Sequence, residues 1–207
     1  MQKKFFILLE EFSKRPTIEI GKSSKSIARL LSTGALVPKA VCIPPQTLRL
    51  IAKTNNLDIK VYKLTQETNF NSPSSINKTT SKLKKLILKQ IIPNSLSKDF
   101  LKIYHDYLQS SFVMVQDLEN IKGDTNVIDA ILEIWAKSAS ETLKKFASKN
   151  TSSDKILYST PILIKQQIDS KISGLAYTFD KKDGNKKRFT IEAIWGIINN
   201  NLKNATR

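Results

Sequence analysis

The 207-residue sequence has one cysteine, one histidine and no long hydrophobic run. A single cysteine excludes an internal disulfide, and the apolar residues around Cys42 predict a buried, inert thiol in a reducing compartment, which we expect to be cytoplasmic. Cys42 and His105 are too few to build a zinc site, and we assign His105 no role. The apolar residues near the N-terminus stop at Glu10, so we expect neither a signal peptide nor a membrane span.

Acidic residues are also scarce. There are 34 Lys and Arg against 18 Asp and Glu, a net charge of +16. Such an excess suits a nucleic-acid binder. Here, however, the basic residues are mostly lysines scattered through a sequence rich in Asn, Ser and Ile, without an arginine-rich block or interleaved aromatic residues. We therefore do not favour nucleic acid as the partner, and keep non-specific nucleic-acid binding as an alternative function.

The stretch from Pro161 to Gly196 contains three strand patterns. Residues 162–164 form a short apolar run, residues 172–179 are rich in strand formers, and residues 189–194 alternate apolar and polar positions. Asp183-Gly184 between the last two is a hairpin signal, because glycine adopts positive φ at little cost. We expect a three-stranded antiparallel unit.

Glu192 lies in the last of these strands and shares a face with Thr190 and Ile194. A carboxylate presented from a sheet either meets a lysine across the strands or holds a metal ion such as Mg²⁺ through oxygen. The spacing by itself favours the lysine pair, because sheets at the protein surface often carry such acids.

A second candidate site lies near the N-terminus. Residues 17–20 predict a strand, and residues 21–26, Gly-Lys-Ser-Ser-Lys-Ser, predict a loop before a helix that ends at Gly34. Free backbone N–H groups together with Lys22 and Lys25 would suit a phosphate. The alternative is a solvated lysine loop.

Residues 40–43 predict a buried strand, and Pro45 suits the first turn of the helix that follows. Residues 66–81 are polar, with few aliphatic side chains, and predict a loop or flexible linker.

Three helices are predicted further along the chain. Residues 82–92 and a second helix, capped by Ser97 and running to Leu108, form a helical hairpin, and a long amphipathic helix begins at Asp124 or Thr125. Residues 149–159 form a polar connection.

Several short motifs occur in the order in which they occur in one known family. They are residues 21–51 with Gly34-Ala35-Leu36-Val37-Pro38, Asn120-Ile121-Lys122-Gly123, Gln166-Gln167-Ile168-Asp169-Ser170, Ser173-Gly174-Leu175-Ala176-Tyr177-Thr178 and Ile191-Glu192-Ala193-Ile194-Trp195-Gly196. In this order they resemble the nucleotide-binding domain of the phosphoenolpyruvate synthase and pyruvate phosphate dikinase family.

The resemblance implies an α+β, two-lobed fold of the ATP-grasp type, incomplete at the C-terminus. Residues 1–65 would form the first lobe with the lysine turn, residues 66–81 the linker, and residues 82–207 the second lobe.

The resemblance also implies a site for ATP and Mg²⁺. Lys22 or Lys25 would bind phosphate, and Glu192 would hold Mg²⁺ with Thr178 nearby. The adenine edge would bond to the chain at the strand connection, through Lys165, Gln167 and Ile168. Catalysis in such a site is chiefly positioning and charge neutralisation.

The sequence departs from the family pattern at two places. Where the family carries an arginine before two serines, this chain has Gln109 or lacks the segment, and a neutral amide cannot replace the forked donors of a guanidinium. Residues 112–115 predict an ordinary strand where the family has a flexible, glycine-bearing loop.

The histidine and barrel domains that complete the family's phosphotransfer to pyruvate are not found either. We therefore expect a fragment, a split subunit whose partner chain carries those domains, or a decayed relative. The alternative is a non-catalytic module that binds a nucleotide or a protein partner.

Overall fold

The computed structural model describes residues 5–14, 20–145 and 152–196. The chain divides into two compact units, Met1–Gln167 and Ile168–Arg207. Helices and strands are mixed, which confirms the α+β class in its coarse form. None of the helices in the described residues combines the length and hydrophobicity that a bilayer-spanning helix needs.

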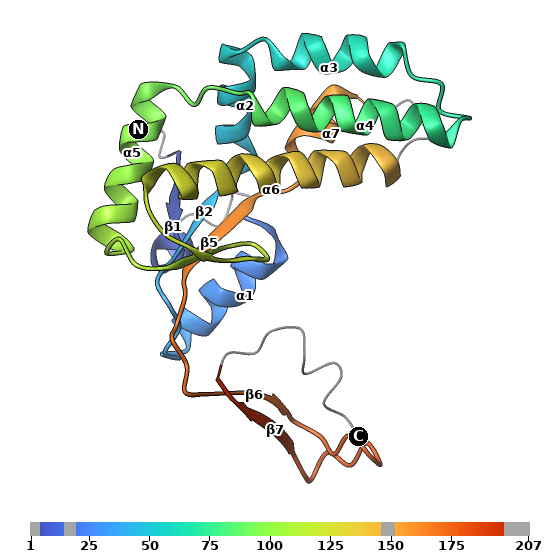
Figure 1. The fold of residues 1–207 in the computed structure, drawn as a ribbon. Helices are drawn as coiled ribbons and strands as arrows, with labels where there is room; N and C mark the ends of the chain where they lie inside the picture. The colour runs from blue at the N-terminus through green and yellow to red at the C-terminus, as the bar shows by residue number, and fades with distance from the viewer. Residues whose placement is uncertain (1–4, 15–19, 146–151, 197–207) are drawn as a thin grey trace. The chain divides into compact units, whose positions relative to one another are not determined.

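The first unit contains a five-stranded antiparallel sheet in the order β1-β2-β5-β3-β4 (Figure 1). Its strands are β1 (Ile7–Leu8), β2 (Ala40–Ile43), β3 (Val113–Val115), β4 (Leu118–Ile121) and β5 (Ile162–Gln166). The helices of this unit are α1 (Gly21–Ser32), α2 (Pro45–Thr54), α3 (Leu57–Gln66), α4 (Pro73–Leu88), α5 (Asn94–Lys102), α6 (Asp124–Lys145) and α7 (Ser153–Tyr158), with a 3-10 helix η1 (Leu9–Lys14) and a π-helix η2 (Ile103–Tyr107).

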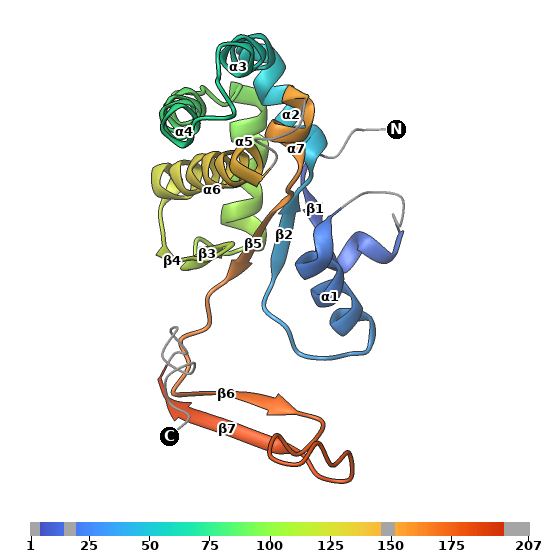
Figure 2. The same cartoon turned by 90° about the vertical axis from the view of Figure 1, so that its right-hand side faces the viewer.

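Both faces of this sheet are buried, and side-chain alternation along the strands assigns each residue to a face. Val41 and Ile164 belong to the large core that includes α4, α5 and α6. Cys42 and Leu163, one position along, belong to a smaller core with α1. The two sets of helices therefore lie on opposite sides of the sheet, as Figure 2 shows.

The predicted elements around β2 are confirmed. Residues 40–43 form a fully buried strand, and α2 begins at Pro45. The end of α1 is a Schellman motif, in which the N–H of Gly34 donates to Leu31 O and the N–H of Ala35 donates to Leu30 O. Gly34 has φ +79°, so its left-handed conformation is as predicted.

Most of the predicted 66–81 linker is helical, which corrects that prediction. α4 begins at Pro73 and is capped by Ser72, whose side chain accepts a hydrogen bond from the N–H of Ser75. Thr79 and Thr80 are buried on its inner face, where Thr80 Oγ1 donates to Ile76 O. Short polar side chains that satisfy their own hydroxyl groups can replace aliphatic ones on a buried face.

The predicted polar connection over 149–159 is also partly wrong, because residues 153–158 form α7; residues 149–151 lie outside the described residues. Ser152 caps the helix by accepting from the N–H of Lys155. The indole Nε1 of Trp135 in α6 donates to Leu157 O at 2.7 Å and so fixes α7 against the long helix.

The predicted three-stranded unit does not form. Strand β5 pairs with β2 and β3 in the first unit, whereas β6 (Ile172–Tyr177) and β7 (Thr190–Trp195) pair only with each other in the second. The periodicity identified all three strands, but strand patterns do not specify their partners.

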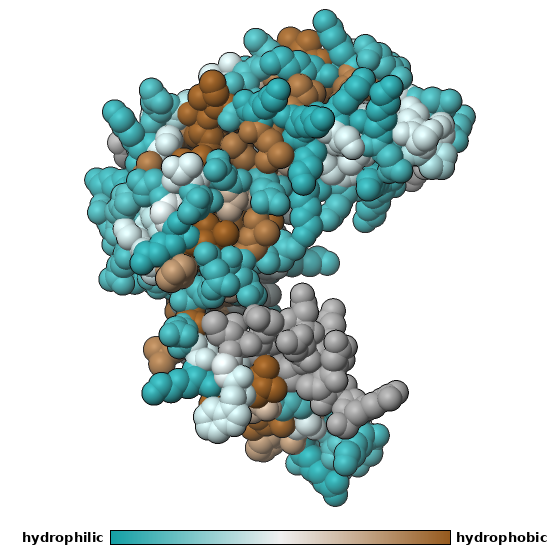
Figure 3. Space-filling model, viewed as in Figure 1, coloured by the Kyte–Doolittle hydropathy of each residue, from teal (hydrophilic) through white to brown (hydrophobic). Residues whose placement is uncertain are grey.

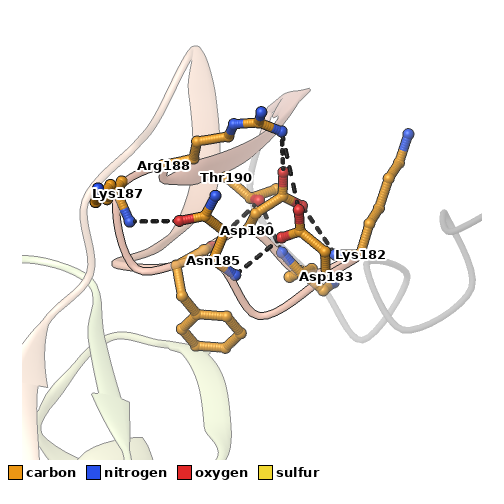
Figure 4. A network of polar contacts seen from close by, with 9 residues as sticks. Asp180, Lys182, Asp183, Asn185, Lys187, Arg188 and Thr190 are labelled. Atoms are coloured by element: carbon orange, nitrogen blue, oxygen red, sulfur yellow. Dashed lines mark hydrogen bonds and ion pairs between the residues drawn. The ribbon is translucent and has the colours of Figure 1, made fainter.

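The β6–β7 turn follows the sequence signal. Gly184 has φ +72°. Asp180, Asp183 and Asn185 each accept a hydrogen bond, through a side-chain oxygen, from the backbone N–H two residues on (Figure 4). Arg188 lies against Asp180 and Asp183 in the same network. These Asx turns build the hairpin tip from local contacts.

The packing of α4 predicts unequal effects from two identical substitutions. Leu83 is fully buried between α4 and α6, whereas Leu88 on the same helix is 41% exposed. We expect Leu83→Ala to lower the free energy of unfolding by about 3 kcal/mol through lost burial and a residual cavity. Leu88→Ala should change it by less than about 0.5 kcal/mol. Urea denaturation measures both, and equal effects would contradict the assignment of α4 to the core.

The burial of Cys42 predicts its chemical reactivity. Burial raises the pKa of the thiol to about 12, although a hydrogen bond with Ser24 acts in the opposite direction. Because the thiolate is the reactive form, native protein should react with iodoacetamide at pH 8 far more slowly than protein unfolded in urea. Rapid native labelling would show that the small core is open.

Candidate functional site

The two lysines of the first candidate site lie in α1. Residues 21–26 form the first turns of this helix, which corrects the predicted loop. Lys22 and Lys25 are exposed. Of the strand predicted over residues 17–20, only Ile20 lies in the described residues, and it is not part of a strand.

The start of α1 is held tightly against the sheet. Gly21 has φ +74°, and a Cβ at this position would lie 2.8 Å from Cγ of Pro161, just before β5. Ile20 and Ser24 are buried, and Cys42 Sγ lies 3.7 Å from Ile20 O. The backbone N–H groups at the start of the helix therefore have a fixed position, and the N-cap side chain provides no hydrogen bond to them.

Helix α1 therefore has the electrostatics of an anion site. The N-terminal end of a helix carries partial positive charge, and two ammonium groups within its first five residues add to it. No acidic residue lies in the first turn.

The predicted adenine-binding segment is largely engaged within the first unit. Lys165 is still part of β5 and pairs with Ala40 and Met114. The backbone N–H of Gln167 donates to Phe112 O at 2.8 Å. Its side-chain amide makes two bonds of 2.7 Å to Asn120, to the backbone N–H and to Oδ1. Gln167 thus joins β5 to β3 and β4.

In the second unit, Glu192 forms an ion pair with a lysine. Lys181 Nζ lies 2.6 Å from Glu192 Oε1 and 4.6 Å from the ring centroid of Tyr177. The hydrogen bond with Glu192 raises the pKa of Lys181, so this ammonium stays charged at neutral pH. Leu175, not a lysine, lies directly across the strands. The predicted pair with a lysine therefore forms, but the lysine comes from the turn after β6. Thr178 is exposed.

This donor set does not resemble a resident metal centre. The described residues contain no group of three or more His, Cys, Asp and Glu side chains placed to hold a metal ion. Mg²⁺ commonly takes only one or two protein carboxylates and completes its coordination with water and substrate phosphates. Lys181 contacts Oε1 of Glu192, so Mg²⁺ would have to share this carboxylate with the lysine or displace it.

His105, given no role from the sequence, links two elements. Its Nδ1 lies 2.7 Å from Ser110 Oγ, and its Nε2 lies 3.1 Å from Asp124 Oδ1. It connects η2 with the first residue of α6. No sequence signal places these three residues together, because the contact to Asp124 depends on the turn and strands between them.

The predicted departures from the family pattern are present in the structure. Residues 113–115 form strand β3, as predicted, with Val113 and Val115 buried. Gln109 has φ +58° and precedes this strand in the turn after η2. This strand pairs with β4 and β5.

Comparison with known proteins gives the same family. Residues 19–116 match the family described as "Pyruvate phosphate dikinase, AMP/ATP-binding domain". Ninety-five per cent of the chain is 21% identical to a probable phosphoenolpyruvate synthase of Staphylothermus marinus and 18% identical to a phosphoenolpyruvate synthase of Aeropyrum pernix.

The chain spans about a quarter of the length of these two relatives, 26% and 27% respectively. The family match includes α1 with both lysines and ends at Gln116. The predicted resemblance to the phosphoenolpyruvate synthase and pyruvate phosphate dikinase family is thus confirmed, with the family match falling on its AMP/ATP-binding domain.

Proposed function

We propose that this chain binds ATP as the nucleotide-binding domain of a phosphoenolpyruvate synthase-like phosphotransferase. The observation that carries the proposal is the match of residues 19–116 to an AMP/ATP-binding domain. That segment contains the start of α1, where Lys22 and Lys25 are exposed and where Gly21 packs closely against Pro161 beside the sheet.

The phosphates of ATP would meet the N-terminal end of α1. Backbone N–H groups of the first turn would donate to phosphate oxygens, and Lys22 or Lys25 would neutralise their charge. Both side chains are exposed, so neither has to break a core contact to reach a ligand.

The adenine would be recognised near Lys165, Gln167 and Ile168. Because the N–H of Gln167 already donates to Phe112 O, we assign the edge contact to the backbone of Ile168. Gln167 then acts by fixing the segment through Asn120.

The second unit would contribute Glu192, with Thr178 nearby, to a Mg²⁺ ion that arrives with the nucleotide. The ion would supply charge neutralisation for the phosphates when bound. Lys181 competes for the same carboxylate, so binding of Mg²⁺ would weaken or displace this ion pair.

The wider proposal is an ATP-grasp type of site with lobes at residues 1–65 and 82–207. Transfer of the phosphoryl group to a histidine and then to pyruvate would need a separate chain that carries those domains, and we place both chains in the cytoplasm. The two relatives are about four times as long as this chain, which supports the need for further domains.

A non-catalytic nucleotide- or partner-binding module is the second candidate. Strand β3 and Gln109 favour it, because they occupy the positions where the family has a mobile loop and an arginine.

Lysine substitutions test the phosphate contact. With ATP and Mg²⁺ at about a hundred times Kd, binding should stabilise the protein by about 2.7 kcal/mol and raise Tm by about 5–10 °C. Either Lys22→Gln or Lys25→Gln should weaken ATP binding about 10- to 100-fold, the usual worth of a charged hydrogen bond.

These variants should fold normally, because removing a cation from a helix N-terminus is neutral or slightly stabilising. Lys53→Gln, at the exposed end of α2, is the control and should keep the full shift. The phosphate assignment fails if wild type shows no shift or if all three variants keep it.

A pair of substitutions tests the role of Glu192. Glu192→Gln removes both the ion pair and the metal ligand, whereas Lys181→Gln removes only the ion pair. We expect Glu192→Gln to abolish the Mg²⁺-dependent part of the ATP shift and Lys181→Gln to preserve or increase it. Identical behaviour of the two variants would reduce Glu192 to an ion-pair partner.

A further inference from the structure

The fold gathers lysines that the sequence spaces apart. Helices α3 and α4 are joined by the short segment 67–72 and lie alongside each other in opposite directions (Figures 1 and 2). An open groove of about 410 Å³ runs between them. We call it the lysine groove; five lysines, one glutamate and two leucines line it, namely Lys60, Lys63, Leu64, Glu67, Lys82, Lys85, Leu86 and Lys89.

The two walls of the lysine groove repeat one pattern. Residues 60–64 read Lys-x-x-Lys-Leu, and residues 82–86 read the same. Lysines three apart lie on one face of a helix, with the leucine beside them. Seven positions after the first lysine of each series lies the C-cap residue of the helix, Glu67 after α3 and Lys89 after α4. The lining therefore carries an excess of four positive charges.

These ammonium groups are available to a ligand. Among the described residues, none of the five groove lysines forms an ion pair, and Lys60 Nζ donates a hydrogen bond to Asn55 O at 3.1 Å. Hydrophilic side chains cover most of the surface over α3 and α4 in Figure 3. Five lysines held together with a single carboxylate, Glu67, favour an anionic partner.

The shape and chemistry of the groove narrow the class of partner. A flat anionic membrane does not enter a concave groove between helices. An acidic protein segment would also need an apolar contact, and the two leucines of the groove offer a small one, because Leu64 is buried and Leu86 is partly buried. A chain of phosphates needs only charges, and the cation spacing along α4 from Lys82 to Lys89 covers about 10 Å.

We propose that the lysine groove binds the phosphodiester backbone of single-stranded nucleic acid without reading its sequence. The lining contains no aromatic side chain on which a base would stack and no arginine that would make a forked contact to a base edge. This activity is separate from ATP binding, since none of the groove residues belongs to the proposed nucleotide site.

Salt dependence tests the proposal. With a fluorescein-labelled 20-nucleotide oligothymidylate, five phosphate contacts predict a slope of log K against log salt of about −3.5, or about a hundredfold loss of affinity between 50 and 200 mM KCl. Removing two contacts with Lys82→Gln and Lys85→Gln should reduce the slope to about −2.1 and the loss to about twentyfold.

The matched control is the double variant Lys98→Gln and Lys102→Gln on α5, which makes the same charge change on another exposed helix. It should keep the wild-type slope, and circular dichroism should show unchanged helix content in both variants. The groove variant should also keep the ATP melting shift, so the two proposals fail independently.

Two results would overturn the proposal. One is an equal decrease of the salt-dependence slope in the groove and control variants, which would show that the net charge of the protein attracts the oligonucleotide without a specific site. The other is tighter binding of a poly-aspartate peptide of matched charge, which would assign the groove to an acidic protein.

Discussion

The first unit depends on the pairing of β5 with two strands far from it in the sequence. Ile164 lies opposite Val41, 123 positions earlier, on one side and opposite Val115, 49 positions earlier, on the other. Buried strands must satisfy their backbone groups in this way. The same strand contributes residues to both cores: Ile164 belongs to the large core with α6, and Leu163 belongs to the small core with α1. Because Gly21 packs against Pro161 just before β5, the position of β5 also fixes the start of α1.

Local signals in the sequence were sufficient for elements that encode their own boundaries. Gly34 ends α1 because a left-handed residue closes the helix, and Pro45 begins α2 because its missing N–H costs nothing there. The start of α4 was missed because its buried face is built from threonines, which read as polar loop. The partners of β5 were missed because periodicity identifies a strand and not its neighbours.

The candidate site was less predictable than the fold. The roles of Lys22 and Glu192 came from resemblance, and the structure adds that they belong to different units and different environments: one lysine exposed at a helix start, one carboxylate held by Lys181. The lysine groove had no signal in composition. Its charges are spread over residues 60–89, and only the turn between α3 and α4 brings them together.

The account as a whole holds that the sheet presents the start of α1 to the phosphates of a nucleotide. An NMR titration of ¹⁵N-labelled full-length protein with ATP and Mg²⁺ tests this most directly, because it reports each backbone N–H separately. The account predicts saturable shifts at the amides of Lys22, Ser23 and Ser24, which lie in the first turn of α1. Shifts confined to α3 and α4, or no saturable shifts, would contradict it.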